Sequence, residues 1–298
     1  MPTQPPYGVI RNLVKEGAIV VFFGAGASLL QRETQAAAAP EHPWTTWLPT
    51  GNQLRAYLAS QTELPLTQDS VVELATVAQY YTWAVGRPDL YKSLHKIFAV
   101  DYPFGKVHKL VADLKAPLLV LTTNYDDMIE KAFRASGKPF DLIIHQTNNE
   151  AQSGSVLFQG HDAAPEYVKP NEVVIDLGRT SVIYKMHGTV ATGNSISDSY
   201  VITEDDYIDF LVRMGSNTPI PSMIQEAFID QHFLFLGYGL TDWNFRVMLG
   251  SLKEHLMKQR SWAIRWQGSP VEEAIWSSRG VLMYDMKVED FGDALGPI

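Results

Sequence analysis

Short apolar runs alternate with amphipathic stretches along most of the chain, and this pattern predicts strands that alternate with helices. Buried strands are predicted at 18–23, 117–122, 140–144, 173–177, 182–187, 232–236, 261–266 and 280–285. Helices are predicted at 7–17, 125–136, 203–214, 219–229, 241–257 and 270–277, with a last one from 288. Such alternation is typical of α/β proteins, so we expect a Rossmann-like, doubly wound and largely parallel sheet.

Three stretches depart from this alternation. Residues 31–54 mix Ala, Pro, Trp and Thr without a period and are predicted to form a long loop. Residues 51–114 are mostly helical in pattern, which is too long for a simple crossover between two strands. We therefore expect a helical insertion at 51–114 within one domain that covers residues 1–298. Residues 145–172 are rich in Asn, Gln, Ser and Gly and are predicted to be irregular.

Composition and charge remove several classes of function. The net charge is −9 and no basic run exceeds two residues, which argues against direct binding of nucleic acid. The chain contains no cysteine, so disulfides, thiol catalysis and cysteine-ligated zinc sites are excluded. No segment approaches the roughly 20 apolar residues that a membrane span needs. We expect a soluble, cytoplasmic protein without a membrane partner.

A pair of glycines follows each of two predicted strands. The carboxyl ends of strands are the places where ligands bind in parallel sheets. Gly24 and Gly26 come directly after 18–23, and Gly237 and Gly239 come after 232–236. Glycines allow a backbone to approach a pyrophosphate, but a tight strand-to-helix turn explains each pair equally well. A dehydrogenase fingerprint would place a third glycine where Leu29 stands, and no Walker lysine pattern occurs, which disfavours a nucleotide triphosphatase.

Polar residues end two further strands. The strand 117–122 runs into Thr122-Thr123-Asn124-Tyr125-Asp126-Asp127. A helix cap, in which an Asn or Asp contributes about 1 kcal/mol, explains one or two polar residues but not five together. Because buried polar groups without partners cost about 1–3 kcal/mol each, we expect a ligand to satisfy this cluster. His187 ends the strand 182–187 and precedes Gly188; a lone histidine is more often structural, but this position also suits a general base.

Taken together, the motifs GAGAS (24–28), TTNYD (122–126), KMHG (185–188) and GYGLTDWNF (237–245) resemble those of the sirtuin superfamily in order and spacing. The similarity is closer to the sirtuin-like NAD-hydrolase domains of bacterial antiphage defence systems, such as Thoeris and the sirtuin–HerA and sirtuin–Argonaute pairs. WLPTGNQL (47–54) also resembles their segment after the glycine loop, and the resemblance spans about residues 8–294. It implies a single sirtuin-like catalytic domain that cleaves NAD⁺ to nicotinamide and ADP-ribose, as a triggered defence effector.

The resemblance also implies a role for each matched residue. Asn124 would hold the nicotinamide ribose and position a water, and His187 would accept a proton. Asp126 would orient the nicotinamide carboxamide or stabilise the nascent cation. The residues expected to bind NAD⁺ are Gly24, Ala25, Gly26, Ser28, Thr123, Tyr125, Gly188, Gly237, Tyr238, Gly239 and Asp242.

Two departures from the sirtuin pattern bear on the reaction. The cysteines of the zinc module of sirtuin deacylases are absent, and their Gly-Ile-Pro-Asp-Phe-Arg segment is missing from the 28–54 loop. We therefore expect NAD⁺ cleavage without a peptide acceptor and without a metal. The alternatives are a module that senses NAD or ADP-ribose without turnover and, less favoured, a deacylase with a different acceptor channel. The expected partners besides NAD⁺ are further copies of this chain, a HerA-type ATPase or an Argonaute-like sensor.

Overall fold

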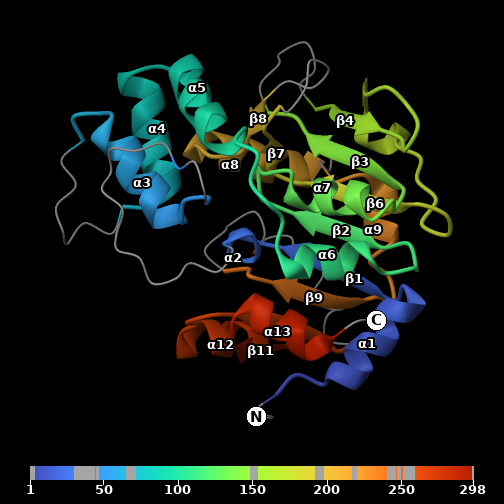
Figure 1. Ribbon diagram of the computed structural model, residues 1–298. Coiled ribbons are helices and arrows are strands. Elements are labelled where there is room, and N and C mark those ends of the chain that lie inside the picture. Colours follow the sequence, from blue (N-terminus) through green and yellow to red (C-terminus); the bar gives the residue numbers. More distant parts are fainter. Residues whose placement is uncertain are drawn as a thin grey trace.

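Among the residues that the structure describes, the main sheet contains nine strands. Figure 1 shows how this sheet lies within the fold. The computed structural model describes residues 4–29, 44, 47–64, 72–147, 154–191, 198–216, 220–239, 246, 250 and 259–296. In spatial order the strands are β11 (Val281–Asp285), β10 (Ser261–Arg265), β9 (His232–Leu236), β1 (Ile19–Phe23), β2 (Leu119–Thr122), β6 (Ser181–Lys185), β3 (Phe140–His145), β4 (Val156–Gln159) and β5 (Glu166–Val168).

All neighbouring strands from β11 to β3 run parallel, and β4 and β5 continue the sheet in antiparallel fashion. The central strand β1 has the sequence IVVFF and every residue of it is buried. Continuous apolar strands of this kind are typical of parallel sheets covered on both faces. The predicted fold class, a doubly wound and largely parallel α/β sheet, is confirmed.

Helices cover both faces of this sheet. Val21 and Phe23 point to the face covered by α1 (Tyr7–Glu16), α6 (Lys106–Ala112), α7 (Met128–Ala135) and α13 (Val288–Leu295). Val20 and Phe22 point to the opposite face, where α8 (Glu204–Ser216), α9 (Ser222–Glu226) and α12 (Pro270–Ser277) contribute to the core. The two sets of side chains separate because successive residues of a strand point to opposite faces.

A third apolar cluster lies beside the sheet. It is formed by α3 (Gly51–Ser60), α4 (Leu74–Ala84) and α5 (Arg87–Phe98), which Figure 1 shows as a group to the left of the sheet. Thr50 begins α3 with a capping box, in which its hydroxyl accepts from the Gln53 amide at 3.2 Å. Met128 and Tyr200 from the sheet side complete the cluster. The assignment of 51–114 as an insertion within one domain of 1–298 stays a prediction.

Several sequence predictions of local structure were wrong. The segment 173–177 is not a strand: Val173 and Ile175 are buried in the core and Val174 is 75% exposed, but none of them pairs with a strand. An extended segment packed on the core shows the same alternation of buried and exposed side chains as a strand does. Conversely, β4 and β5 lie within 145–172, because the pairing of β4 with β3 and of β5 with β4 outweighs the polar composition. The predicted helix 241–257 lies outside the described residues.

Helix α7 begins at Met128, three residues later than predicted, with Asp127 as its N-cap residue. The preceding Asp126 binds the first helical residue, since its Oδ1 accepts from the Met128 amide at 3.1 Å. In the part of the chain that the structure describes, no helix has the length and apolar character to cross a bilayer.

Candidate active site

The four motifs follow strands whose carboxyl ends lie in register with one another. In the strand registers, Phe23 of β1 lies beside Leu236 of β9 on one side and Thr122 of β2 on the other. Thr122 in turn lies beside Lys185 of β6. On one side of β1 lie β2 and β6, and on its other side lie β9, β10 and β11. The order of the strands therefore reverses beside β1, which makes the carboxyl edge there a topological switch point. Ligands of doubly wound proteins bind in the crevice at such a point.

The two glycine motifs pack directly on each other. The Gly24 amide donates to the Leu236 carbonyl at 2.9 Å, and the Gly26 amide donates to the Gly237 carbonyl at 3.0 Å. A Cβ atom on Gly24 would stand 2.6 Å from the Gly237 oxygen. This close approach of two backbones gives the glycines a structural role that is independent of any ligand.

The remaining residues of these motifs lie at different depths. Ala25 begins the short helix α2 (Ala25–Ser28), and Ser28 at its end is buried. Tyr238 is buried in the core, and Gly239 lies near the guanidinium of Arg265. Asp242, which was predicted to bind NAD⁺, lies outside the described residues.

Asn124 is half-buried and bridges two strand ends. Its Nδ2 donates to the Gly24 carbonyl at 3.1 Å and to the Ser28 hydroxyl at 2.9 Å. Its backbone amide donates to Thr122 Oγ1 at 3.0 Å, and the Thr122 hydroxyl donates to the Phe23 carbonyl at 2.9 Å. The side chain of Asn124 is thus fixed at the switch point. These protein partners satisfy part of the polar cluster for which the sequence suggested a ligand.

Two other polar residues of this loop were expected to bind NAD⁺. Thr123 is half-buried. Tyr125 donates its hydroxyl to the Val201 carbonyl at 2.7 Å, and its ring packs edge-on against Phe98 and Tyr200 at 5.2 and 5.1 Å between centroids. Tyr125 therefore joins the loop to the third apolar cluster.

A buried group of charges lies beneath the loop. Asp126 is buried, and burial is the main cause that raises the pKa of its carboxyl, while the nearby Lys185 opposes the shift. Lys185 is fully buried and its Nζ lies 2.8 Å from Oε1 of Glu130, in helix α7. Burial also raises the pKa of Glu130. Lys185 and Glu130 were not singled out from the sequence, although a lysine within the apolar strand VIYKM signals a buried carboxylate partner.

His187 lies two residues after the end of β6, which pairs with β2, the strand that leads to Asn124. It is 3% exposed because helix α8 covers it: its ring meets Tyr207 and Phe210 edge-on, at 5.5 and 6.1 Å between centroids. The next residue, Gly188, has φ +85°, and a Cβ there would stand 2.0 Å from the Ser199 carbonyl oxygen. The predicted turn after the histidine therefore requires glycine.

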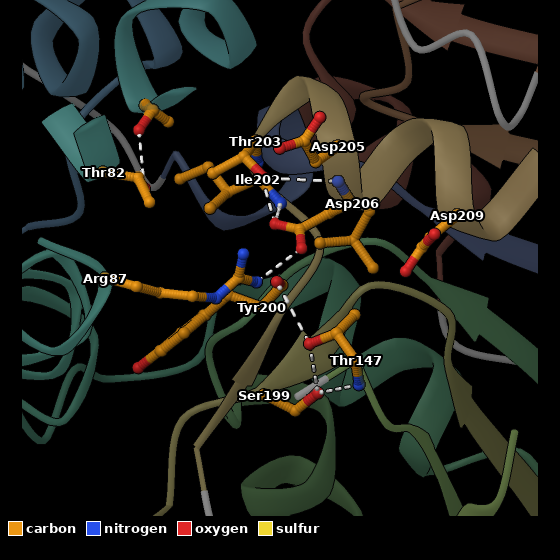
Figure 2. A network of polar contacts seen from close by, with 12 residues as sticks. Thr82, Arg87, Thr147, Ser199, Tyr200, Ile202, Thr203, Asp205, Asp206 and Asp209 are labelled. Atoms are coloured by element: carbon orange, nitrogen blue, oxygen red, sulfur yellow. Dashed lines mark hydrogen bonds and ion pairs between the residues drawn. The ribbon is translucent and has the colours of Figure 1, made fainter. Parts of the chain in front are cut away.

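Helix α8 is anchored to the helical group by the contacts in Figure 2. Asp206 forms an ion pair with Arg87 of α5. The same carboxylate accepts from the amides of Ile202 and Thr203 at 3.1 and 2.9 Å, which caps the start of α8. Together these contacts hold α8 in its place over His187.

A second buried histidine, His145, ends the neighbouring strand β3. Its ring meets Phe210 edge-on at 5.0 Å. Burial lowers the pKa of His145 to about 3, and the nearby His187 adds to the shift. His145 lines a small pocket of about 10 Å³ with Thr147, Asp206, Asp209, Phe210 and Arg213. Because its low pKa keeps His145 neutral near pH 7, it supplies no positive charge beside His187.

Acid is expected to destabilise the fold through its buried histidines. Burial lowers the pKa of His108, as of His145, to about 3, against 6.5 ordinarily. Between these pKa values the unfolded chain binds protons that the folded chain does not, so the free energy of unfolding falls as pH falls. Melting temperatures from about pH 7 to about pH 4 measure this slope. His145→Gln is expected to flatten it and the exposed-site control His161→Gln to leave it unchanged; equal slopes in all three proteins would contradict the argument.

Among the described residues, no group of three or more His, Asp or Glu side chains is arranged to hold a metal ion. What the site offers is a fixed amide, a buried carboxylate and an imidazole at neighbouring strand ends. These groups are suited to bind hydroxyls and to accept a proton.

Comparison with known proteins gives a family match and several relatives. The family described as SIR2-like domain matches residues 118–284. The NAD(+) hydrolase ThsA of Acinetobacter baumannii (strain 532279) is 29% identical over 195 residues, which cover 65% of this chain and 34% of that protein. The defense-associated sirtuin 2 of Bacillus subtilis is 25% identical over 267 residues, 88% of this chain and 22% of that protein.

A third relative, the NAD(+) hydrolase ThsA of Enterococcus faecium, is 25% identical over 80% of this chain and 41% of that protein. A solved structure described as a Sir2 homolog–NAD complex aligns over 99% of this chain and 94% of that chain, with 12% identity and a TM-score of 0.42. The chain thus spans between about a fifth and two fifths of the length of these three curated relatives.

Proposed function

The chain belongs to the SIR2-like family, and from this premise we propose that it hydrolyses NAD⁺ to nicotinamide and ADP-ribose. The observation that carries the proposal is that the four motifs follow strands whose carboxyl ends lie side by side at the switch point. Asn124 and His187 follow two neighbouring strands of this set. Relatives named NAD(+) hydrolase support the same activity.

In the proposed reaction, a water attacks the ribose carbon as its bond to nicotinamide breaks, and the bonding electrons leave with nicotinamide. Positive charge builds on the ribose in the transition state. His187 accepts the proton of the attacking water, or of a ribose hydroxyl, at a ring nitrogen. Asn124 holds the ribose and the water, since its side chain is already fixed by Gly24 and Ser28. Asp126 orients the nicotinamide carboxamide or stabilises the developing cation.

The glycine loops supply the proposed pyrophosphate and adenosine contacts. Gly24, Gly26 and Gly237 bring two backbones together at the switch point, where the proposal places the pyrophosphate. The proposal assigns NAD⁺ contacts also to Ala25, Ser28, Thr123, Tyr125, Gly188, Tyr238, Gly239 and Asp242.

A role in antiphage defence is part of the proposal, supported by the relative named defense-associated sirtuin 2. In that role, infection would trigger NAD⁺ depletion. The coverage of His187 by α8 fits an enzyme whose basal activity is low before a trigger. We also propose further copies of the chain or a separate sensor protein as partners.

The test is turnover of NAD⁺ by the purified chain. We expect nicotinamide and ADP-ribose to form in equal amounts, at a rate unchanged by a chelator. Release of nicotinamide only when an acyl-lysine peptide is present would instead indicate a deacylase. Calorimetric binding of NAD⁺ or ADP-ribose without product, both in vitro and in phage-infected cells that express the chain, would indicate a sensor. The absence of both binding and product would refute the proposal.

A further inference from the structure

Lys185 is a fully buried cation at the last position of β6, two residues before His187. An ammonium group has three hydrogens to donate, and three protein oxygens lie within hydrogen-bond distance of Lys185 Nζ. One partner is Oε1 of Glu130 at 2.8 Å, and the others are the backbone carbonyls of Asp126 and, at 3.5 Å, Tyr125. Two of the three contacts thus go to the loop between β2 and α7.

A contribution to stability does not explain this arrangement. Taking two charges out of water costs free energy that their attraction often fails to return, and two apolar residues of similar size commonly do as well. What an apolar pair cannot do is bind carbonyl oxygens. The specific effect of the ammonium is therefore on the shape of the loop.

The loop held in this way carries two residues of the site. Asn124 and Asp126 stand on either side of the Tyr125 carbonyl, which also accepts from the Val190 amide at 3.1 Å. The lysine belongs to the strand that leads to His187. A single side chain thus joins the strand that carries the imidazole to the loop that carries the amide and the carboxylate.

We propose that Lys185 is a positioning residue for the reaction: its ammonium, oriented by Glu130, sets the loop of Asn124 and Asp126 relative to His187. The inference rests on the proposed NAD⁺ hydrolysis for its catalytic consequence. Its structural consequence, a loop held by the ammonium, is measurable without any turnover.

The decisive variant replaces both charges, Lys185→Met with Glu130→Met, since replacing Lys185 alone would leave the Glu130 carboxylate buried without its cation. We expect the melting temperature to stay close to that of the wild type, because the neutral pair fills the same space. Hydrogen exchange of the amides at 124–128 is expected to accelerate roughly tenfold, as the loop opens locally. The kcat for nicotinamide release is expected to fall about 10²-fold, with a smaller change in KM, because misplaced groups lose alignment.

Lys106→Met with Asp293→Asn, which removes an exposed ion pair, is the matched control and is expected to change none of these quantities. If the double variant keeps both wild-type exchange at 124–128 and wild-type kcat, the inference is overturned. If the wild type itself does not turn over NAD⁺, the proposed function fails, and exchange at 124–128 still decides whether Lys185 sets the loop. Should the double variant not fold, Glu130→Gln decides: faster exchange confined to 124–128 supports the inference, and unchanged exchange overturns it.

Discussion

Replacing His187 with alanine is expected to reduce nicotinamide release from NAD⁺ about 10²–10⁴-fold, the usual contribution of a general base. The imidazole is the group in the KMHG motif that can accept a proton, and it lies at the strand end next to that of Asn124. Because burial lowers the pKa of His145 to about 3, its imidazole is a weak base and is not expected to replace the lost one.

Asn124→Ala is expected to reduce the rate to a similar extent, since the amide holds the ribose and the water. This change also removes two hydrogen bonds, to Gly24 and Ser28, at a cost of about 1 kcal/mol each. Melting temperatures must therefore accompany the rates. The exposed-site variants His161→Ala and Asn52→Ala are matched controls and are expected to retain full activity. Turnover in both site variants at the wild-type rate would remove His187 and Asn124 from the mechanism.

Gly237→Ala is expected to destabilise the protein by about 3 kcal/mol or more and to abolish NAD⁺ binding. Gly237 has φ +66°, and a Cβ there would lie 2.3 Å from the Ala27 nitrogen and 2.5 Å from the Gly26 carbon. Both obstacles are backbone atoms of the opposite loop, so relief requires that the two glycine loops move apart.

The matched control for this change is Gly239→Ala in the same loop. The nearest atoms to a Cβ there are those at the end of the Arg265 side chain, at 3.1 Å, and that group can turn away. We expect a change of about 0.5 kcal/mol or less in the free energy of unfolding. Denaturant unfolding of both variants measures the difference, and equal destabilisation by the two would show that the contact between the loops does not require glycine.

The fold class, most of the strands and helices, and the position of the four motifs after strands were predictable from the sequence. Hydrophobic periodicity is a local property, and a buried parallel strand such as IVVFF shows it without reference to its neighbours. The same local signal failed at 173–177, where Val173 and Ile175 are buried by packing rather than by strand pairing.

Which polar groups become partners was decided only by the tertiary structure. Lys185 and Glu130 are 55 positions apart in the chain, and Arg87 and Asp206 are 119 apart. The partner of a buried charge depends on which elements become neighbours in space, and no period in the sequence records that. The sequence by itself thus determined the elements and the types of residue at the site, whereas the packing of α7 and α8 against the strand ends determined how those residues are held.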